Sequence, residues 1–130
     1  MPIRNRPPTG LGATVTRQVL PANLSEKAFQ TAIMDLAAWY GWRRFHPRTV
    51  QVMKGAHLTP YLGEAGFPDL VLVHRQRGVI FAELKAQKGR PTAAQELWRA
   101  DLEQAGAEYH LWRPSDWWAI EKRLKGDTPT

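Results

Sequence analysis

The sequence predicts a single small α/β domain with the element order helix, three strands, helix, strand and helix, and with a central mixed sheet flanked by helices. Three observations indicate this class. Two short apolar runs, at 70–73 and 79–82, are separated by a polar stretch of hairpin-loop length. Two longer segments, at 24–40 and 92–106, carry apolar residues at helical spacing. At 130 residues, the chain has room for one hydrophobic core.

The composition favours a folded, basic protein. Hydrophobic residues make up 43% of the chain and include six Trp, which argues against wholesale disorder. The formal net charge is +6, so we expect a polyanionic partner. The chain has no cysteine, which excludes disulfides and Cys nucleophiles and fits a reducing, cytoplasmic compartment. No apolar run approaches membrane-spanning length and the first residues lack the apolar core of a signal peptide, so we expect no membrane partner.

The chain divides into an arm, a domain and a tail. Residues 1–22 are rich in proline, glycine and arginine and show no periodicity. We interpret them as a flexible basic arm that contacts DNA or a second subunit, although a terminus without a function explains the same composition equally well. The folded domain is predicted to span 23–125, and 126–130 form a short C-terminal tail.

The first helix is predicted over 24–40, where apolar residues recur at helical spacing until Gly41. Asn23 or Ser25 can cap its start, and Asn23 followed by Glu26 resembles a capping box. Capping is a sufficient structural reason for Glu26.

A first strand is predicted at 42–46, and a long connection without periodicity at 47–66. Arg44 in the strand, and Arg48 and Lys54 in the connection, are candidate contacts to the phosphate backbone of DNA. Solvated surface charge explains these basic side chains equally well.

The two apolar runs are predicted to form an antiparallel hairpin of buried strands, covered on both faces, with its turn near 75–76. Because strand side chains alternate between faces, Glu83 and Lys85 share a face. In this register Asp69 lies opposite the end of the second strand, beside Glu83. A slip of one residue would turn Asp69 to the other face.

Two carboxylates and an ammonium at the ends of paired strands suit a hard, oxygen-preferring cation such as Mg²⁺. Lys85 can then orient or deprotonate an attacking water, or offset charge on a phosphate. The alternative is a Glu83–Lys85 salt bridge at a strand end, with Asp69 as a turn residue after Pro68. The hairpin spacing and the downstream elements favour the metal site.

A basic turn at 86–91 follows the hairpin, and its Lys88 and Arg90 are placed to hold a phosphate of DNA. Thr92 and Gln95 then form a capping box that opens the second helix, which is a sufficient structural reason for Gln95.

The second helix is expected to end at Gly106, with a fourth strand at 107–112 and a last helix from Pro114 to Lys125. The buried stripe of the second helix is predicted to be Leu97, Trp98, Leu102 and Ala105, and that of the last helix Trp117, Ile120 and Leu124.

The order of these elements and motifs resembles the PD-(D/E)XK nuclease superfamily and, more narrowly, its VRR-NUC (virus-type replication-repair nuclease) family, which is common in phage genomes. The resemblance covers about residues 24–124. The residues that carry it are Ser25-Glu26, Gln30, Gly41-Trp42, His46, Gly66 to Leu70, Phe81 to Lys85, Lys88 to Arg90, Gln95, Gly106 and Trp112 to Asp116.

The resemblance implies a restriction-endonuclease-like αβββαβ core and a set of site residues. Asp69 and Glu83 would coordinate Mg²⁺ or Mn²⁺ together with the backbone carbonyl of Leu84. Lys85 would act on the attacking water or the scissile phosphate, and Gln95 would support the site from the second helix. The resemblance also raises Glu26 to an additional metal or water ligand.

The function that the resemblance implies is a metal-dependent DNA endonuclease that hydrolyses phosphodiester bonds in double-stranded or branched DNA, such as Holliday junctions or flaps. Family members often act as homodimers, and a phage-encoded member would work in the host cytoplasm. The connection at 47–66 looks longer than the usual one, so substrate preference is not carried over. The alternative is a catalytically silent DNA-binding module of the same fold.

Overall fold

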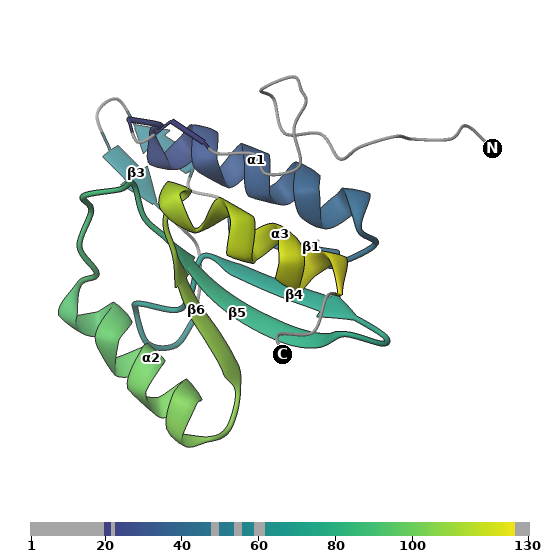
Figure 1. Cartoon of the computed structure of the whole chain (residues 1–130). Coiled ribbons are helices and arrows are strands. Elements are labelled where there is room, and N and C mark those ends of the chain that lie inside the picture. The colour runs from purple at the N-terminus through teal and green to yellow at the C-terminus, as the bar shows by residue number, and fades with distance from the viewer. Residues whose placement is uncertain (1–19, 22, 48–49, 54–55, 59–61, 127–130) are drawn as a thin grey trace.

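The computed structural model describes residues 20–21, 23–47, 50–53, 56–58 and 62–126. These residues form a small α/β domain around a four-stranded mixed sheet of order β1-β4-β5-β6 (Figure 1). Strands β1 (Arg43–Phe45), β4 (Leu70–His74) and β5 (Gly78–Leu84) are antiparallel neighbours, and β6 (Glu108–Trp112) runs parallel to β5. The α/β class and the mixed sheet are therefore confirmed.

Helices cover the sheet unequally. α1 (Glu26–Trp39) and α3 (Trp117–Lys125) lie on one face, while α2 (Ala93–Gln104) lies on the other, near the edge strand β6 (Figure 1). A short 3₁₀ helix, η1 (Pro114–Asp116), leads into α3. None of the helices within the described ranges has both the length and the apolar character needed to cross a membrane.

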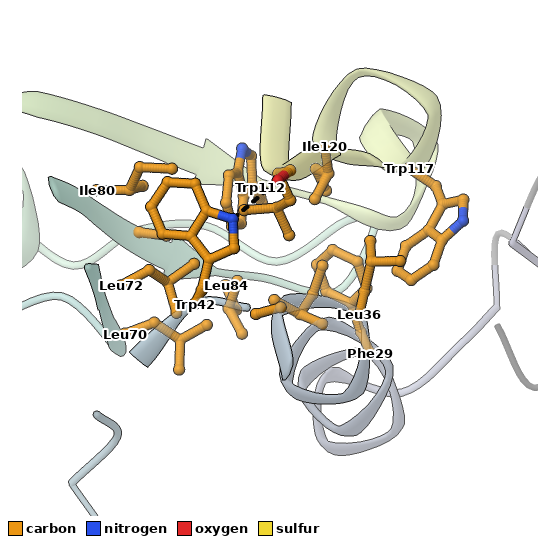
Figure 2. Close-up of a cluster of buried hydrophobic side chains, with 14 of the residues drawn as sticks. Phe29, Leu36, Trp42, Leu70, Leu72, Ile80, Leu84, Trp112, Trp117 and Ile120 are labelled. Carbon is orange, nitrogen blue, oxygen red and sulfur yellow. Dashed lines mark hydrogen bonds between the residues drawn. The ribbon is translucent and has the colours of Figure 1, made fainter. Parts of the chain in front are cut away.

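The core lies between the sheet and the helix pair α1 and α3. Apolar side chains of both helices and of alternate strand positions meet there (Figure 2), because alternate residues of a strand point to the same face. The indole N–H of Trp42 donates a hydrogen bond of 2.8 Å to the carbonyl of Leu124, which ties the start of β1 to the end of α3 (Figure 2). The core residues include Phe29, Ile33, Leu36, Leu70, Leu72, Ile80, Ala82, Leu84, Trp112, Trp117, Ile120 and Leu124.

The first helix begins at Glu26, and of the two predicted capping residues it is Ser25, and not Asn23, that caps it. The Ser25 hydroxyl accepts a hydrogen bond of 3.1 Å from the N–H of Ala28, so Ser25 is the N-cap. Glu26 is the first helical residue and is exposed, where a carboxylate complements the helix dipole.

The expected structureless connection at 47–66 is wrong in part. Two short strands, β2 (Val50–Met53) and β3 (Ala56–Leu58), pair antiparallel within it and form a separate two-stranded sheet. Strands this short carry too few alternating positions to reveal a period of two in the sequence.

The predicted buried stripe of α2 is wrong in part, because Trp98 and Leu102 are half-buried whereas Leu97 and Ala105 are exposed. No residue of α2 is fully buried, and the side chain of Leu97 is 68% exposed. The helix packs at its edge through Trp98, whose ring meets Phe67 edge-on at 5.0 Å between centroids, and Phe67 in turn meets Phe81 of β5. Contacts among these three aromatic rings join α2 to the sheet in place of a buried stripe, because α2 crosses only part of the sheet.

The face of the sheet that carries α2 is therefore open at its far end. The β4–β5 hairpin extends beyond α2 (Figure 1), and Val73 and Val79 near its tip are 39% and 44% exposed. The expectation that both strands are covered on both faces holds only for the face that packs on α1 and α3.

Candidate metal centre

The hairpin register brings Asp69 and Glu83 together. Leu70 of β4 pairs with Ala82 of β5, and extending this antiparallel register by one residue puts Asp69 opposite Glu83. The N–H of Leu84 donates a hydrogen bond of 2.9 Å to Asp69 Oδ2, which fixes this carboxylate against β5. The predicted register and the predicted shared face of the two acids are confirmed.

Glu83 is the one charged residue in the buried part of the described chain, with 1% of its surface exposed. Its Oε2 accepts a hydrogen bond of 2.7 Å from the Gln95 side-chain amide, and Lys85 Nζ lies 3.6 Å from the same oxygen. Oε1 is buried and has no hydrogen-bond partner within the described ranges. A buried carboxylate oxygen without a partner is costly, and such atoms in native proteins are associated with bound ions or catalysis.

The environment of Glu83 disfavours its charge. Burial raises the pKa of Glu83 from 4.5 to about 8. The negative charge of Asp69 and a hydrogen bond through a proton that the two carboxyl groups share add to the rise, and Lys85 opposes it. Two carboxylates this close repel each other unless a proton or a cation lies between them. The pair therefore has the chemistry of a hard-cation site, and a divalent ion beside Oε1 would supply its missing partner.

Gln95 forms hydrogen bonds both to the start of α2 and to Glu83. Its side-chain Oε1 accepts from the N–H of Thr92 at 2.8 Å, which completes the predicted capping box, while its Nε2 donates to Glu83. One amide thus joins the start of α2 to the buried carboxylate. The capping bond and the contact with Glu83 are made at the same time, because the amide has a donor end and an acceptor end.

The basic turn after Lys85 is held by residues that follow the neighbouring end of β6, which runs parallel to β5. Arg113 Nη1 donates to the carbonyls of Ala86, Gln87 and Gly89, at 3.0, 3.2 and 2.6 Å. The Gln87 side chain also exchanges two hydrogen bonds with Ser115. This turn is therefore preorganised beside the acids by residues that follow β6.

A pocket of about 440 Å³ lies against this turn. Lys88, Arg90 and Arg113 contribute positive charge to its lining and Glu96 contributes one negative charge. Lys88 and Arg90, which the sequence predicts as DNA contacts, therefore line the same pocket, in the turn that follows Lys85.

Two neighbours of the acids were not predicted as site residues, although His46 is among the residues that carry the resemblance. A ring nitrogen of His46, Nδ1, lies 2.7 Å from the carbonyl oxygen of Asp69 and so supports the backbone of this residue. Tyr109 of β6 pairs with Phe81 and shares the face of Glu83; burial raises the pKa of Tyr109 to about 12, and the charge of Glu83 adds to this rise. A single His and a single Tyr fit the core as well as a site, so only the fold reveals their positions.

The remaining predicted residues are not gathered at the acids. Glu26 lies in the first turn of α1, exposed, and the described part of the chain contains no group of three or more His, Asp or Glu side chains arranged to hold a metal ion. Arg44 lies on the edge strand β1, where its guanidinium donates to the Met34 carbonyl. Arg48 and Lys54 lie outside the described residues.

Comparisons of the chain with protein-family models, with curated proteins and with solved structures gave no match.

Proposed function

We propose that this chain is a Mg²⁺- or Mn²⁺-dependent nuclease that hydrolyses phosphodiester bonds of DNA. The observation that carries the proposal is the unpartnered Oε1 of buried Glu83, held beside the Asp69 carboxylate and within reach of the Lys85 ammonium. A salt bridge between Glu83 and Lys85 does not by itself account for the second carboxyl group, Asp69, that is held against buried Glu83.

The side chains have separate roles. Asp69 and Glu83 would hold the cation with the Leu84 carbonyl, and the bound cation would withdraw negative charge from the scissile phosphate. Lys85 Nζ lies 3.6 Å from Glu83 Oε2, and 13% of the Lys85 side chain is exposed. Its positive charge would face the phosphate of a bound substrate. Gln95 positions Glu83 by its 2.7 Å hydrogen bond.

The charge of the chain favours a polymeric substrate. With a formal net charge of +6, and with Lys88 and Arg90 beside the acids, the surface attracts the phosphate backbone of nucleic acid. A fold of the PD-(D/E)XK type, activity on double-stranded or branched DNA and a VRR-NUC relationship are the narrower part of this proposal. They are supported by the hairpin geometry and the order of the motifs.

The test is cleavage of duplex, flap and four-way DNA with Mg²⁺ or Mn²⁺, compared between the wild type and Lys85→Met. We expect the variant to lose at least about 100-fold in rate, because a positive charge at the reacting phosphate is removed. Lys27→Met is the matched control, since Lys27 is exposed on α1, across the sheet from the acids. Full activity of Lys85→Met would overturn the proposed roles, and salt-sensitive binding of DNA that the wild type never cleaves would indicate the silent binding module.

A further inference from the structure

An exposed aromatic ring lies on the edge strand β1. The side chain of Phe45 is 61% exposed, and two partly exposed side chains, Val73 and Val79, lie on the neighbouring strands β4 and β5. Phe45 pairs directly with Val71, and Arg43 pairs directly with Val73. The outer part of the sheet therefore carries an apolar surface that includes one arginine. We call Arg43, Phe45, Val73 and Val79 the β1 patch.

The β1 patch points away from the helix pair α1 and α3. Arg44 donates a hydrogen bond of 3.2 Å to the carbonyl of Met34 in α1, so the Arg44 side chain points to the face that packs on α1. Because side chains alternate between faces along a strand, Arg43 and Phe45 point to the opposite face, the one that carries α2. α2 packs near β6 and leaves the β1 side of this face open (Figure 1).

The acids lie on the same face as the β1 patch. Gln95 of α2 donates to Glu83, which places the Glu83 carboxylate on the face of α2. In the extended hairpin register Asp69 lies opposite Glu83. Since Phe45 pairs with Val71, Asp69 is the diagonal neighbour of Phe45, and the Cα atoms of diagonal neighbours lie about 7–8 Å apart. A strand of nucleic acid that is bound at the acids can therefore also contact the Phe45 ring.

The β1 patch combines apolar surface with positive charge. Among the described residues no ion pair involves Arg43, and a guanidinium group without a carboxylate partner favours a phosphate. An aromatic ring stacks on the face of a nucleobase. In a continuous duplex the neighbouring base pairs cover both faces of each base, so only an unpaired base offers a face to the ring. An unpaired nucleotide therefore matches both features of the patch.

A second copy of the chain matches the β1 patch less well. A standard protein interface has about 20–30 residues on each side, whereas the β1 patch is limited to a few side chains at the outer ends of three strands. Two copies related by a twofold axis would present the same patch to each other and bring their Arg43 side chains together. Like charges that meet across an interface are unfavourable.

From these observations we infer that the β1 patch binds an unpaired nucleotide of the substrate, with Phe45 stacked on its base and Arg43 paired with its phosphate. The inference rests on the proposed function and narrows its substrate class to nucleic acid with unpaired bases at the site, such as flaps, gaps and single strands. Phe45 and Arg43 are binding residues that take no part in the chemical step.

The experiment measures binding in EDTA of a single strand of about 12 nucleotides, of a duplex that carries a single-stranded flap, and of a blunt duplex. Phe45→Leu keeps an apolar side chain but removes the ring. We expect this variant to bind the single strand and the flap about 10-fold more weakly and the blunt duplex as tightly as the wild type. Arg43→Gln should lower the slope of log affinity against log salt for the single strand by about 0.7, the value for one phosphate contact.

Two controls separate stacking from general apolar contact. Phe45→Tyr keeps the ring and should bind all the probes as the wild type does. Leu97→Ala removes an apolar side chain of α2 that is 68% exposed, and it should change the binding of none of the probes. Binding of the blunt duplex also reports whether each variant is folded.

Three results would overturn the inference. The first is an equal loss of affinity by Phe45→Leu for the blunt duplex and for the probes with unpaired bases, and the second is no loss for any probe. The third is light scattering that shows a dimer for the wild type and a monomer for Phe45→Leu, which would assign the β1 patch to a second copy of the chain.

Because binding is measured without a metal ion, the result does not depend on cleavage. A wild type that shows the expected preference for unpaired bases but leaves every DNA intact would count against the proposed nuclease and would support the β1 patch. Cleavage that requires Lys85 but shows no effect of Phe45→Leu on any substrate would support the nuclease and overturn the inference.

Discussion

Replacing Glu83 by Gln tests the acid pair without measuring catalysis. The amide has nearly the same shape and cannot ionise, so Glu83→Gln removes the charge that burial and Asp69 disfavour. An acid whose pKa is raised on folding contributes stability below its unfolded value, near 4.5, and this contribution is lost as the pH rises through about 8. The wild type should therefore lose stability over this range from this group, whereas the variant should not.

The magnitude follows from the pKa of Glu83. A rise from 4.5 to about 8 corresponds to up to about 5 kcal/mol of unfolding free energy between the fully protonated and fully ionised limits. In metal-free buffer, the advantage of Glu83→Gln over the wild type should therefore grow between about pH 5 and about pH 8 by a few kcal/mol and change little above this range.

Urea unfolding in EDTA at several pH values measures this difference. The matched control is Glu103→Gln, since Glu103 is 49% exposed on α2 and forms only a surface ion pair. Mn²⁺ at about 100 times its Kd should stabilise the wild type by about 2.7 kcal/mol, and Glu83→Gln by much less. A difference between Glu83→Gln and the wild type that does not change with pH would refute the reasoning.

Three further changes test the surrounding structure. Gly66→Ala should cost several kcal/mol in urea unfolding, because the added Cβ would lie 2.5 Å from the backbone of α2 at a φ of +96°, while Gly63→Ala, with open space around it, should cost only about 1 kcal/mol. Arg123→Lys should cost about 1–2 kcal/mol because it removes a two-pronged bond to a β6 carboxylate, whereas Arg99→Lys on the surface of α2 should change the midpoint little. Gln95→Glu keeps the capping acceptor but adds a third carboxylate to the pair of Asp69 and Glu83, so cleavage should fall while helix content in circular dichroism is kept.

The sequence by itself determined the elements with strong local signals. The hairpin was predictable because two apolar runs flank a short polar loop that ends in Gly78, which adopts a φ of +102°. The capping box at Thr92 was predictable because its bonds join residues three apart. The shared face of Glu83 and Lys85 followed from strand alternation alone.

Only the tertiary structure decided which residues far apart in the sequence contact one another. The support of the basic turn by Arg113 joins residues 24 to 27 positions apart, and a pocket at the other end of the sheet is lined by residues of α1, β1 and the hairpin turn. The exposure of Leu97 reflects where α2 crosses the sheet, which helical periodicity does not specify. Local rules fix which way a side chain points within its own element, whereas burial and partners are set by how the elements pack against one another.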